Sequence, residues 1–132
     1  MKTLSKIGNT ILNILLVLVI VGGISIAYTS ATSGKPSVFG YRAIHVVSGS
    51  MEPVIMTDQF VLGKITDGDD VQIGDIIAYK EKGVLKRTII HRVIEMYEED
   101  GTTYYIFKGD NNDERDPDPV TADMFLYKII WY

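Results

Sequence analysis

The chain has 132 residues, 13 basic and 17 acidic side chains and a formal net charge of −4, which allows one modest domain. It contains no cysteine and two histidines, which excludes disulfides and thiolate metal sites and argues against a zinc site. The acidic balance, without a basic stripe interleaved with aromatic residues, argues against a nucleic-acid-binding protein.

The charge is distributed unevenly along the chain. Lys2 and Lys6 are the only charged residues among residues 1–34, so residues 35–132 carry 11 basic and 17 acidic residues, a net charge of −6. The apolar residues 1–34 are therefore followed by an acidic, polar segment, residues 35–132. We expect residues 1–34 to form a short cytoplasmic tip and a transmembrane anchor, and residues 35–132 to form a β domain outside the cytoplasm.

The first predicted element is an apolar helix over residues 11–28, in which Asn13 is the only strongly polar residue. Because a bilayer core is crossed by ~20 helical residues, this helix can span a membrane once. Lys2 and Lys6 precede it, and the positive-inside rule then places the N-terminus in the cytoplasm of a cell-membrane protein. A cleaved secretory signal peptide is the alternative, although its apolar run is usually only about 7–15 residues long.

After Gly34 the pattern predicts a mainly β domain, because short apolar runs alternate with turn signals. Strands are expected over residues 43–47, 59–65, 76–79, 85–96, 103–107 and 125–132. Turns are expected at residues 66–70, at Lys82-Gly83 and at Asp100-Gly101, a favourable hairpin pair. Residues 109–119 are expected to form a long polar loop.

Three polar clusters could carry chemistry, and the first follows a predicted strand directly. It has the sequence Ser48-Gly49-Ser50-Met51-Glu52-Pro53. Its glycine lets the backbone turn sharply, and its proline stiffens the exit from the turn. Such a turn can expose one serine hydroxyl and direct a neighbouring N–H toward the same point. An ordinary surface loop is the alternative.

The second cluster is centred on His91, within a run of β-branched residues. Strand alternation places His91 on the same face as Ile89 and Val93, which is expected to be the less exposed face. An imidazole with a pKa near neutrality can accept a proton from a serine hydroxyl at physiological pH. The alternative is a core histidine whose ring bonds a backbone carbonyl.

The third cluster covers residues 108–116 and has four acids between Asp110 and Asp116. It does not fit an EF-hand calcium loop, because Arg115 stands at the position of the invariant glycine and Thr121 at that of the bidentate glutamate. A calcium loop of another type and a solvated acidic turn are alternatives. One of these aspartates could instead orient His91 and stabilise its imidazolium, which would make the chain a serine hydrolase.

These clusters resemble the motifs of type I signal peptidases and occur in the same order over residues 48–116. The resembling segments are Ser48-Gly49-Ser50-Met51-Glu52-Pro53, Gly74-Asp75-Ile76-Ile77-Ala78-Tyr79, Ile90-His91-Arg92-Val93 and Lys108-Gly109-Asp110-Asn111-Asn112, followed by Asp116. His91 stands where the common bacterial branch has lysine. The chain therefore resembles the branch of the endoplasmic reticulum, which is shared by archaea and by SipW-like enzymes of Gram-positive bacteria.

The resemblance implies a role for each matching residue. Ser50 would be the nucleophile, His91 the general base, Asp116 the acid that orients His91, and Asp110 a second acid with a structural role. The backbone N–H of Ser50 and the hydroxyl of Ser48 would be the oxyanion donors. No metal or cofactor is implied.

The implied function is that of a membrane-bound serine endopeptidase that removes signal peptides from secretory preproteins after small residues. Two other classes compete with it. One is a non-enzymatic, membrane-tethered β domain that assembles a surface structure or binds a partner. The other is a self-cleaving repressor-type peptidase, which uses a lysine base and lacks a membrane anchor, so that the apolar run over residues 11–28 argues against it.

Overall fold

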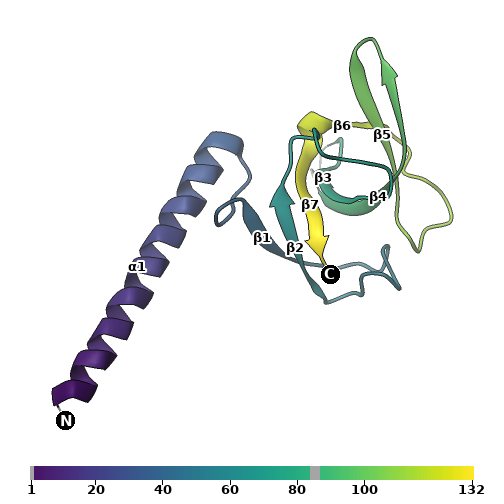
Figure 1. The fold of residues 1–132 in the computed structure, drawn as a ribbon. Helices are drawn as coiled ribbons and strands as arrows, with labels where there is room; N and C mark the ends of the chain where they lie inside the picture. The colour runs from purple at the N-terminus through teal and green to yellow at the C-terminus, as the bar shows by residue number, and fades with distance from the viewer. Residues whose placement is uncertain (1, 84–86) are drawn as a thin grey trace. The chain divides into compact units, whose positions relative to one another are not determined.

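The computed structural model describes residues 2–83 and 87–132, and the chain divides into two compact units, Met1–Gly40 and Tyr41–Tyr132 (Figure 1). The first unit contains the helix α1 (Lys2–Ser33). The second contains the strands β1 (Tyr41–His45), β2 (Phe60–Ile65), β3 (Ile76–Lys80), β4 (Thr88–Glu99), β5 (Thr102–Lys108), β6 (Val120–Thr121) and β7 (Phe125–Trp131), with a short 3₁₀ turn η1 (Ala122–Met124) before β7.

Helix α1 contains the predicted apolar run and is longer than predicted. Its segment Lys6–Ser33 has 28 residues and a mean hydropathy of 2.6, which is long and apolar enough to span a membrane. The hydroxyls of Thr10 and Thr32 donate to the carbonyls four residues earlier, which satisfies these polar groups within the helix. The helix ends at Ser33, and the next residue, Gly34, forms a typical C-terminal cap with a positive φ of 65° and a bond from its N–H to the Ser30 carbonyl.

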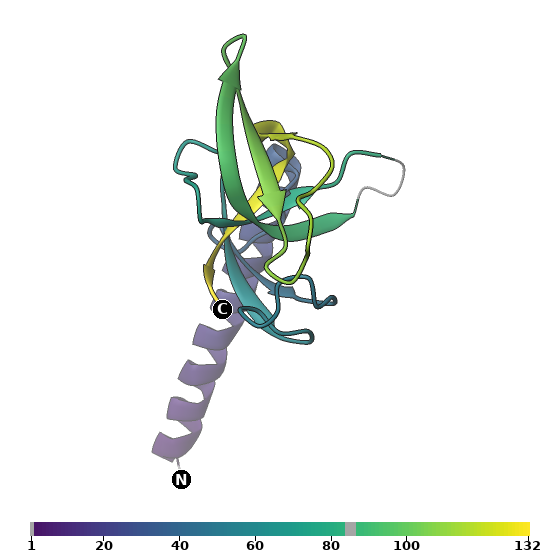
Figure 2. The ribbon, with the colours of Figure 1, turned by 90° about the vertical axis from the view of Figure 1, so that its right-hand side faces the viewer.

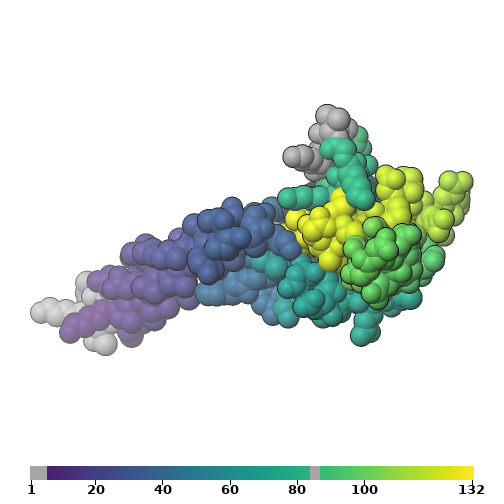
Figure 3. All heavy atoms as spheres, turned by 90° about the horizontal axis from the view of Figure 1, so that it is seen from above, coloured from purple at the N-terminus to yellow at the C-terminus, as the bar shows by residue number. Residues whose placement is uncertain are grey.

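The second unit is built on one antiparallel sheet with the strand order β1-β2-β7-β3-β4-β5-β6. The last strand, β7, therefore lies between β2 and β3 and joins elements that are distant in the sequence. Strands β4 and β5 form a long hairpin that extends beyond the rest of the sheet (Figures 1 and 2). The space-filling view looks down on the green residues of this hairpin (Figure 3), and β5 pairs with the short strand β6 at the edge of the sheet.

The structure confirms a mainly β domain and most of the predicted strands. The turn at Asp100-Gly101 is confirmed, with φ values of 49° and 74° that fit a tight hairpin. Strand β1 ends at His45 instead of Val47, because the backbone groups of Val46 bond residues 58 and 59 before β2 begins. Strand β4 extends three residues beyond the predicted end, and β6 was not predicted. The predicted start of β4 at residue 85 lies outside the described residues.

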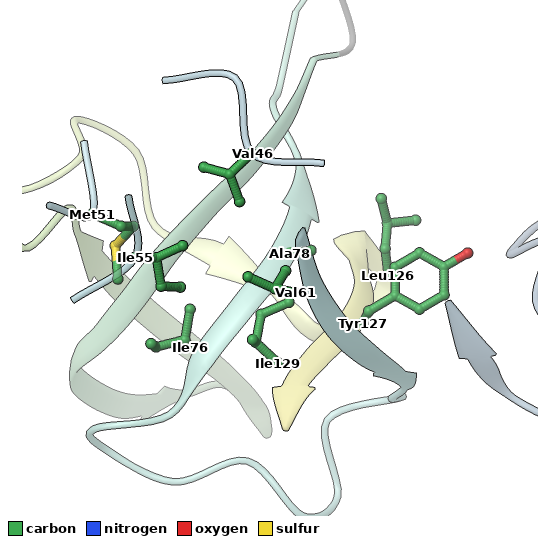
Figure 4. Packing of buried hydrophobic residues seen from close by; sticks show 9 residues of the cluster. All are labelled: Val46, Met51, Ile55, Val61, Ile76, Ala78, Leu126, Tyr127 and Ile129. Carbon is green, nitrogen blue, oxygen red and sulfur yellow. The ribbon is translucent and has the colours of Figure 1, made fainter. Parts of the chain in front are cut away.

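Two apolar clusters stabilise the sheet from opposite faces. Strand β3 contributes alternate residues to each, and its first four residues are all buried. One cluster contains Val46, Met51, Ile55, Val61, Ile76, Ala78, Leu126, Tyr127 and Ile129 (Figure 4). The other contains Val71, Ile77, Tyr79, Val93, Tyr105, Phe107, Val120 and Phe125. These clusters fix the loops that carry the polar residues of interest.

Candidate active site

The serine turn is anchored to the core by the residues that follow it. Ser50 precedes Met51, which is 1% exposed, and both Met51 and Ile55 pack with Val46 and Ile76 in the first cluster (Figure 4). Burial of a side chain of this size contributes about 1.5–3 kcal/mol. The apolar residues after Ser50 therefore hold the backbone of the turn in one place.

The acidic loop is hydrogen-bonded to the same turn. The backbone N–H of Asn111 donates to the Ser50 carbonyl at 2.9 Å, and its side-chain amide donates to the Gly49 carbonyl at 3.0 Å. Gly109 permits this approach, because a Cβ atom there would lie 2.6 Å from the Ser50 carbonyl oxygen. Residues 49–50 and 109–111, about 60 positions apart in the sequence, are thus joined by hydrogen bonds.

Strand β4 places His91 on its buried face, as the alternation predicted. His91 is 7% exposed, and its Nδ1 lies 2.7 Å and 2.9 Å from the two carboxylate oxygens of Asp116. An ionised carboxylate only accepts hydrogen bonds, so Nδ1 carries the proton and donates it. The other ring nitrogen, Nε2, is then the one that can accept a proton from a serine.

Asp116 makes further hydrogen bonds besides the one to His91. Its backbone N–H donates to the Phe107 carbonyl at 2.8 Å, and the Tyr79 hydroxyl donates a short hydrogen bond to its Oδ2. Burial by itself raises the pKa of Asp116, but the hydrogen bonds from His91 and Tyr79 outweigh it and keep this pKa below its usual value. The carboxylate is consequently ionised beside His91 at neutral pH.

Asp110, the second acid, contacts a different partner. Its two oxygens accept hydrogen bonds from Arg92 Nε at 2.9 Å and Arg92 Nη2 at 2.6 Å. This bidentate bond raises the pKa of Arg92 and joins β4 to the loop that carries Asn111. Arg92 also donates to the Gly74 carbonyl at 2.8 Å. Asp110 therefore lies where it can hold the loop, while Asp116 lies against the histidine.

The structure brings the serines and His91 to one pocket. A cavity of about 510 Å³ is lined by Ser48, Ser50 and His91, and its other walls are mostly apolar, with contributions from Ile44, Val46, Met51, Ile55, Ile89 and Ile90. The hydroxyls of Ser48 and Ser50 lie 3.4 Å apart. The cavity therefore brings two hydroxyls and an imidazole together, which are the groups expected of a nucleophile, a hydrogen-bond donor and a base.

Sequence reasoning missed Tyr79 and the double hydrogen bond of Asn111. Both residues occur inside the resembling segments, but neither had an assigned role. The role of Tyr79 depends on the pairing of Ile77 with His91, which puts Tyr79 and His91 on one face of neighbouring strands. Alternation along residues 76–79 and 89–93 could have signalled that shared face only if the register had been known.

We expect Asp116 to stabilise the fold at neutral pH and to lose this effect in acid. Its pKa is lower in the folded state than the usual aspartate value of about 4, so its contribution is present above that pH and is lost as the pH falls through the folded-state value. The difference in free energy of unfolding between wild type and Asp116→Asn should therefore shrink below about pH 4. Denaturant unfolding of both full chains in detergent would measure it, and a difference that stays constant between about pH 5 and pH 2 would contradict the expectation.

The site contains the three kinds of side chain that define the Ser-His-Asp class of hydrolases: the His91 ring is bonded to Asp116, and Ser50 lines the same cavity as His91. These residues belong to the mainly β unit, which follows the apolar helix in the sequence. No protein-family model matches the chain. It is similar to signal peptidase I W of Bacillus subtilis, with 34% identity over 118 residues that cover 89% of this chain and 61% of the relative. The chain is a relative of the type I signal peptidases, which confirms the resemblance drawn from its four motifs.

Two eukaryotic proteins support the assignment to the branch with histidine. The signal peptidase complex catalytic subunit SEC11C of Homo sapiens is 36% identical over 72 residues, which cover 54% of this chain and 37% of that protein. The subunit sec11 of Schizosaccharomyces pombe is 43% identical over 54 residues, which cover 39% of this chain and 27% of that protein. The chain thus spans about three fifths of the length of the bacterial relative and about a third of the human one.

Proposed function

We propose that this chain is a membrane-bound serine endopeptidase that removes N-terminal signal peptides from secretory preproteins. The observation that carries the proposal is the single pocket shared by Ser50 and His91, where the ring of His91 is bonded to Asp116. The relatives, which are named as signal peptidases, support the substrate class.

In the proposed mechanism, Ser50 Oγ attacks the scissile carbonyl while His91 Nε2 accepts its proton. Asp116 stabilises the imidazolium that forms, and the backbone N–H of Ser50 with the hydroxyl of Ser48 donates to the developing oxyanion. His91 then protonates the leaving amine. Water hydrolyses the acyl-enzyme and restores the free Ser50 hydroxyl. Asp110 takes no part in proton transfer and keeps the loop in place through Arg92.

The pocket suggests how the substrate is recognised. Ile44 on the edge strand β1 and Ile90 on β4 contribute apolar walls near the serines. An extended peptide that pairs with a sheet edge would place alternate side chains toward such walls. The resemblance to signal peptidases implies that the side chains before the scissile bond are small, such as alanine.

We assign residues 1–34 to a cytoplasmic tip and a single-pass anchor, and residues 35–132 to the catalytic domain outside the cytoplasm. Lys2 and Lys6 before the apolar run favour this orientation. Because a preprotein also carries an apolar helix, anchoring both molecules in one membrane raises their effective concentration. The cell membrane is the proposed location.

The proposal is tested by mixing the purified full chain in detergent micelles with a preprotein that carries an Ala-x-Ala cleavage site. We expect a shortened product whose new N-terminus follows the second alanine. A matched preprotein with bulky residues in place of both alanines should stay intact. If the first preprotein also stays intact, the chain is not a signal peptidase, and the non-enzymatic β domain becomes the better description.

A further inference from the structure

Tyr79 is a buried tyrosine with a defined place beside the site. It lies on β3 and is 3% exposed, and its ring packs on that of Phe107 with centroids 4.5 Å apart. The register pairs Ile77 with His91 and Tyr79 with Ile89, so that all four side chains lie on one face of β3 and β4. The hydroxyl of Tyr79 is therefore directed along the same face as the imidazole of His91.

That hydroxyl meets the carboxylate that holds the histidine. It donates to Oδ2 of Asp116, the same oxygen that lies 2.7 Å from His91 Nδ1. Because a bond from the Asp116 backbone N–H to the Phe107 carbonyl fixes the main chain, the two side-chain donors then determine how the carboxylate group is turned. Without Tyr79, His91 would be the one side chain among the described residues that bonds this group.

We propose that Tyr79 is a positioning residue, which holds the Asp116 carboxylate in the orientation that receives the Nδ1 proton of His91. The inference rests on the proposed function and deepens it, because it adds a fourth residue to the serine, histidine and aspartate. Its importance comes from the transition state, in which the imidazolium forms and a misdirected carboxylate stabilises it less well.

The charges around the carboxylate favour a neutral, donating tyrosine. Burial, the hydrogen bond to Asp116 and the negative charges of Asp116 and Glu81 all raise the pKa of Tyr79, so its hydroxyl keeps its proton. A small cavity of about 220 Å³ borders Tyr79 and Asp116 and brings Glu81, Lys82 and Asp118 near them. Among the side chains described around this carboxylate, His91 and Tyr79 are those that bond it.

The test compares the cleavage kinetics of wild type and Tyr79→Phe, which keeps the ring on Phe107 and removes only the hydroxyl. We expect kcat to fall about tenfold, the effect of one charge-assisted hydrogen bond, while KM is unchanged. Tyr105→Phe is the matched control. Tyr105 is also buried, packs on Phe125 at 4.8 Å, and directs its hydroxyl to the Gly68 carbonyl at 3.4 Å. Its variant should keep the wild-type kcat.

A double-mutant cycle separates positioning from a general structural role. In a chain that already carries Asp116→Ala, the change Tyr79→Phe should leave kcat where it is, because the carboxylate that it orients is gone. An equal loss of kcat with and without Asp116 would overturn the inference. So would a Tyr79→Phe variant with wild-type kcat. If wild type itself cleaves no preprotein, the proposed function is wrong, and the inference about Tyr79, which depends on it, is wrong as well.

Discussion

Replacement of Ser50 or His91 by alanine is expected to lower kcat by about 10⁶-fold, because the members of a catalytic triad act as one unit. Without the Ser50 hydroxyl no acyl-enzyme forms, and without His91 the imidazole that is bonded to Asp116 and would accept the serine proton is lost. Binding of the preprotein should persist, since the apolar walls of the cavity are unchanged. Single-turnover assays with a labelled preprotein would measure the loss, and thermal unfolding of the same samples would show that each variant is folded.

The chain supplies a matched control for each of these residues. Ser48 is the other serine of the turn, with its hydroxyl 3.4 Å from that of Ser50, and as an oxyanion donor its loss should lower kcat by only about 10²–10³-fold. His45, the second of the two histidines, also lines this cavity, but its ring lies against Asp58 and Phe60 and not against Asp116, so His45→Ala should retain turnover. If Ser48→Ala were inactive and Ser50→Ala active, the nucleophile would be Ser48.

The fold was predictable from the sequence where the determinants are local. Short apolar runs between turn signals predicted β2, β3 and β5 to within one or two residues, and Asp100-Gly101 predicted the turn between β4 and β5. The position of β7 between β2 and β3 was not predictable, because pairing between distant strands depends on the whole sheet. The short strand β6 has only two residues and carries too weak a pattern to be recognised.

The site was predictable only in part, for a related reason. His91 could be placed on a buried face from its own strand, but spacing alone could not choose between Asp110 and Asp116 as its partner. That choice came from the resemblance, and in the structure Asp116 contacts His91 while Asp110 contacts Arg92. Tyr79 escaped notice because a tyrosine in a buried strand usually packs as a core residue, and its hydroxyl partner lies 37 residues away.

Replacement of Asp116 and replacement of Asp110 by alanine should have different effects, because the two acids contact different partners. Asp116→Ala removes the carboxylate behind His91, and we expect kcat per folded molecule to fall by about 10⁴-fold, as it does in serine proteases that lose the aspartate of the triad. Asp110→Ala leaves that carboxylate in place, so its kcat per folded molecule should remain close to wild type. Cleavage assays normalised to the folded fraction would measure both values.

The effect of Asp110→Ala should instead be on stability. It leaves the guanidinium of Arg92, whose side chain is 27% exposed, without its bidentate partner, and the free energy of unfolding should fall by about 2 kcal/mol. Asp110 precedes Asn111, which donates hydrogen bonds to the carbonyls of Gly49 and Ser50. The Asp110→Ala variant should therefore also lose its activity at a lower temperature than wild type does. A strong loss of kcat in a folded Asp110→Ala chain, with a normal kcat in Asp116→Ala, would mean that the carboxylate seen beside His91 is not the one that supports proton transfer.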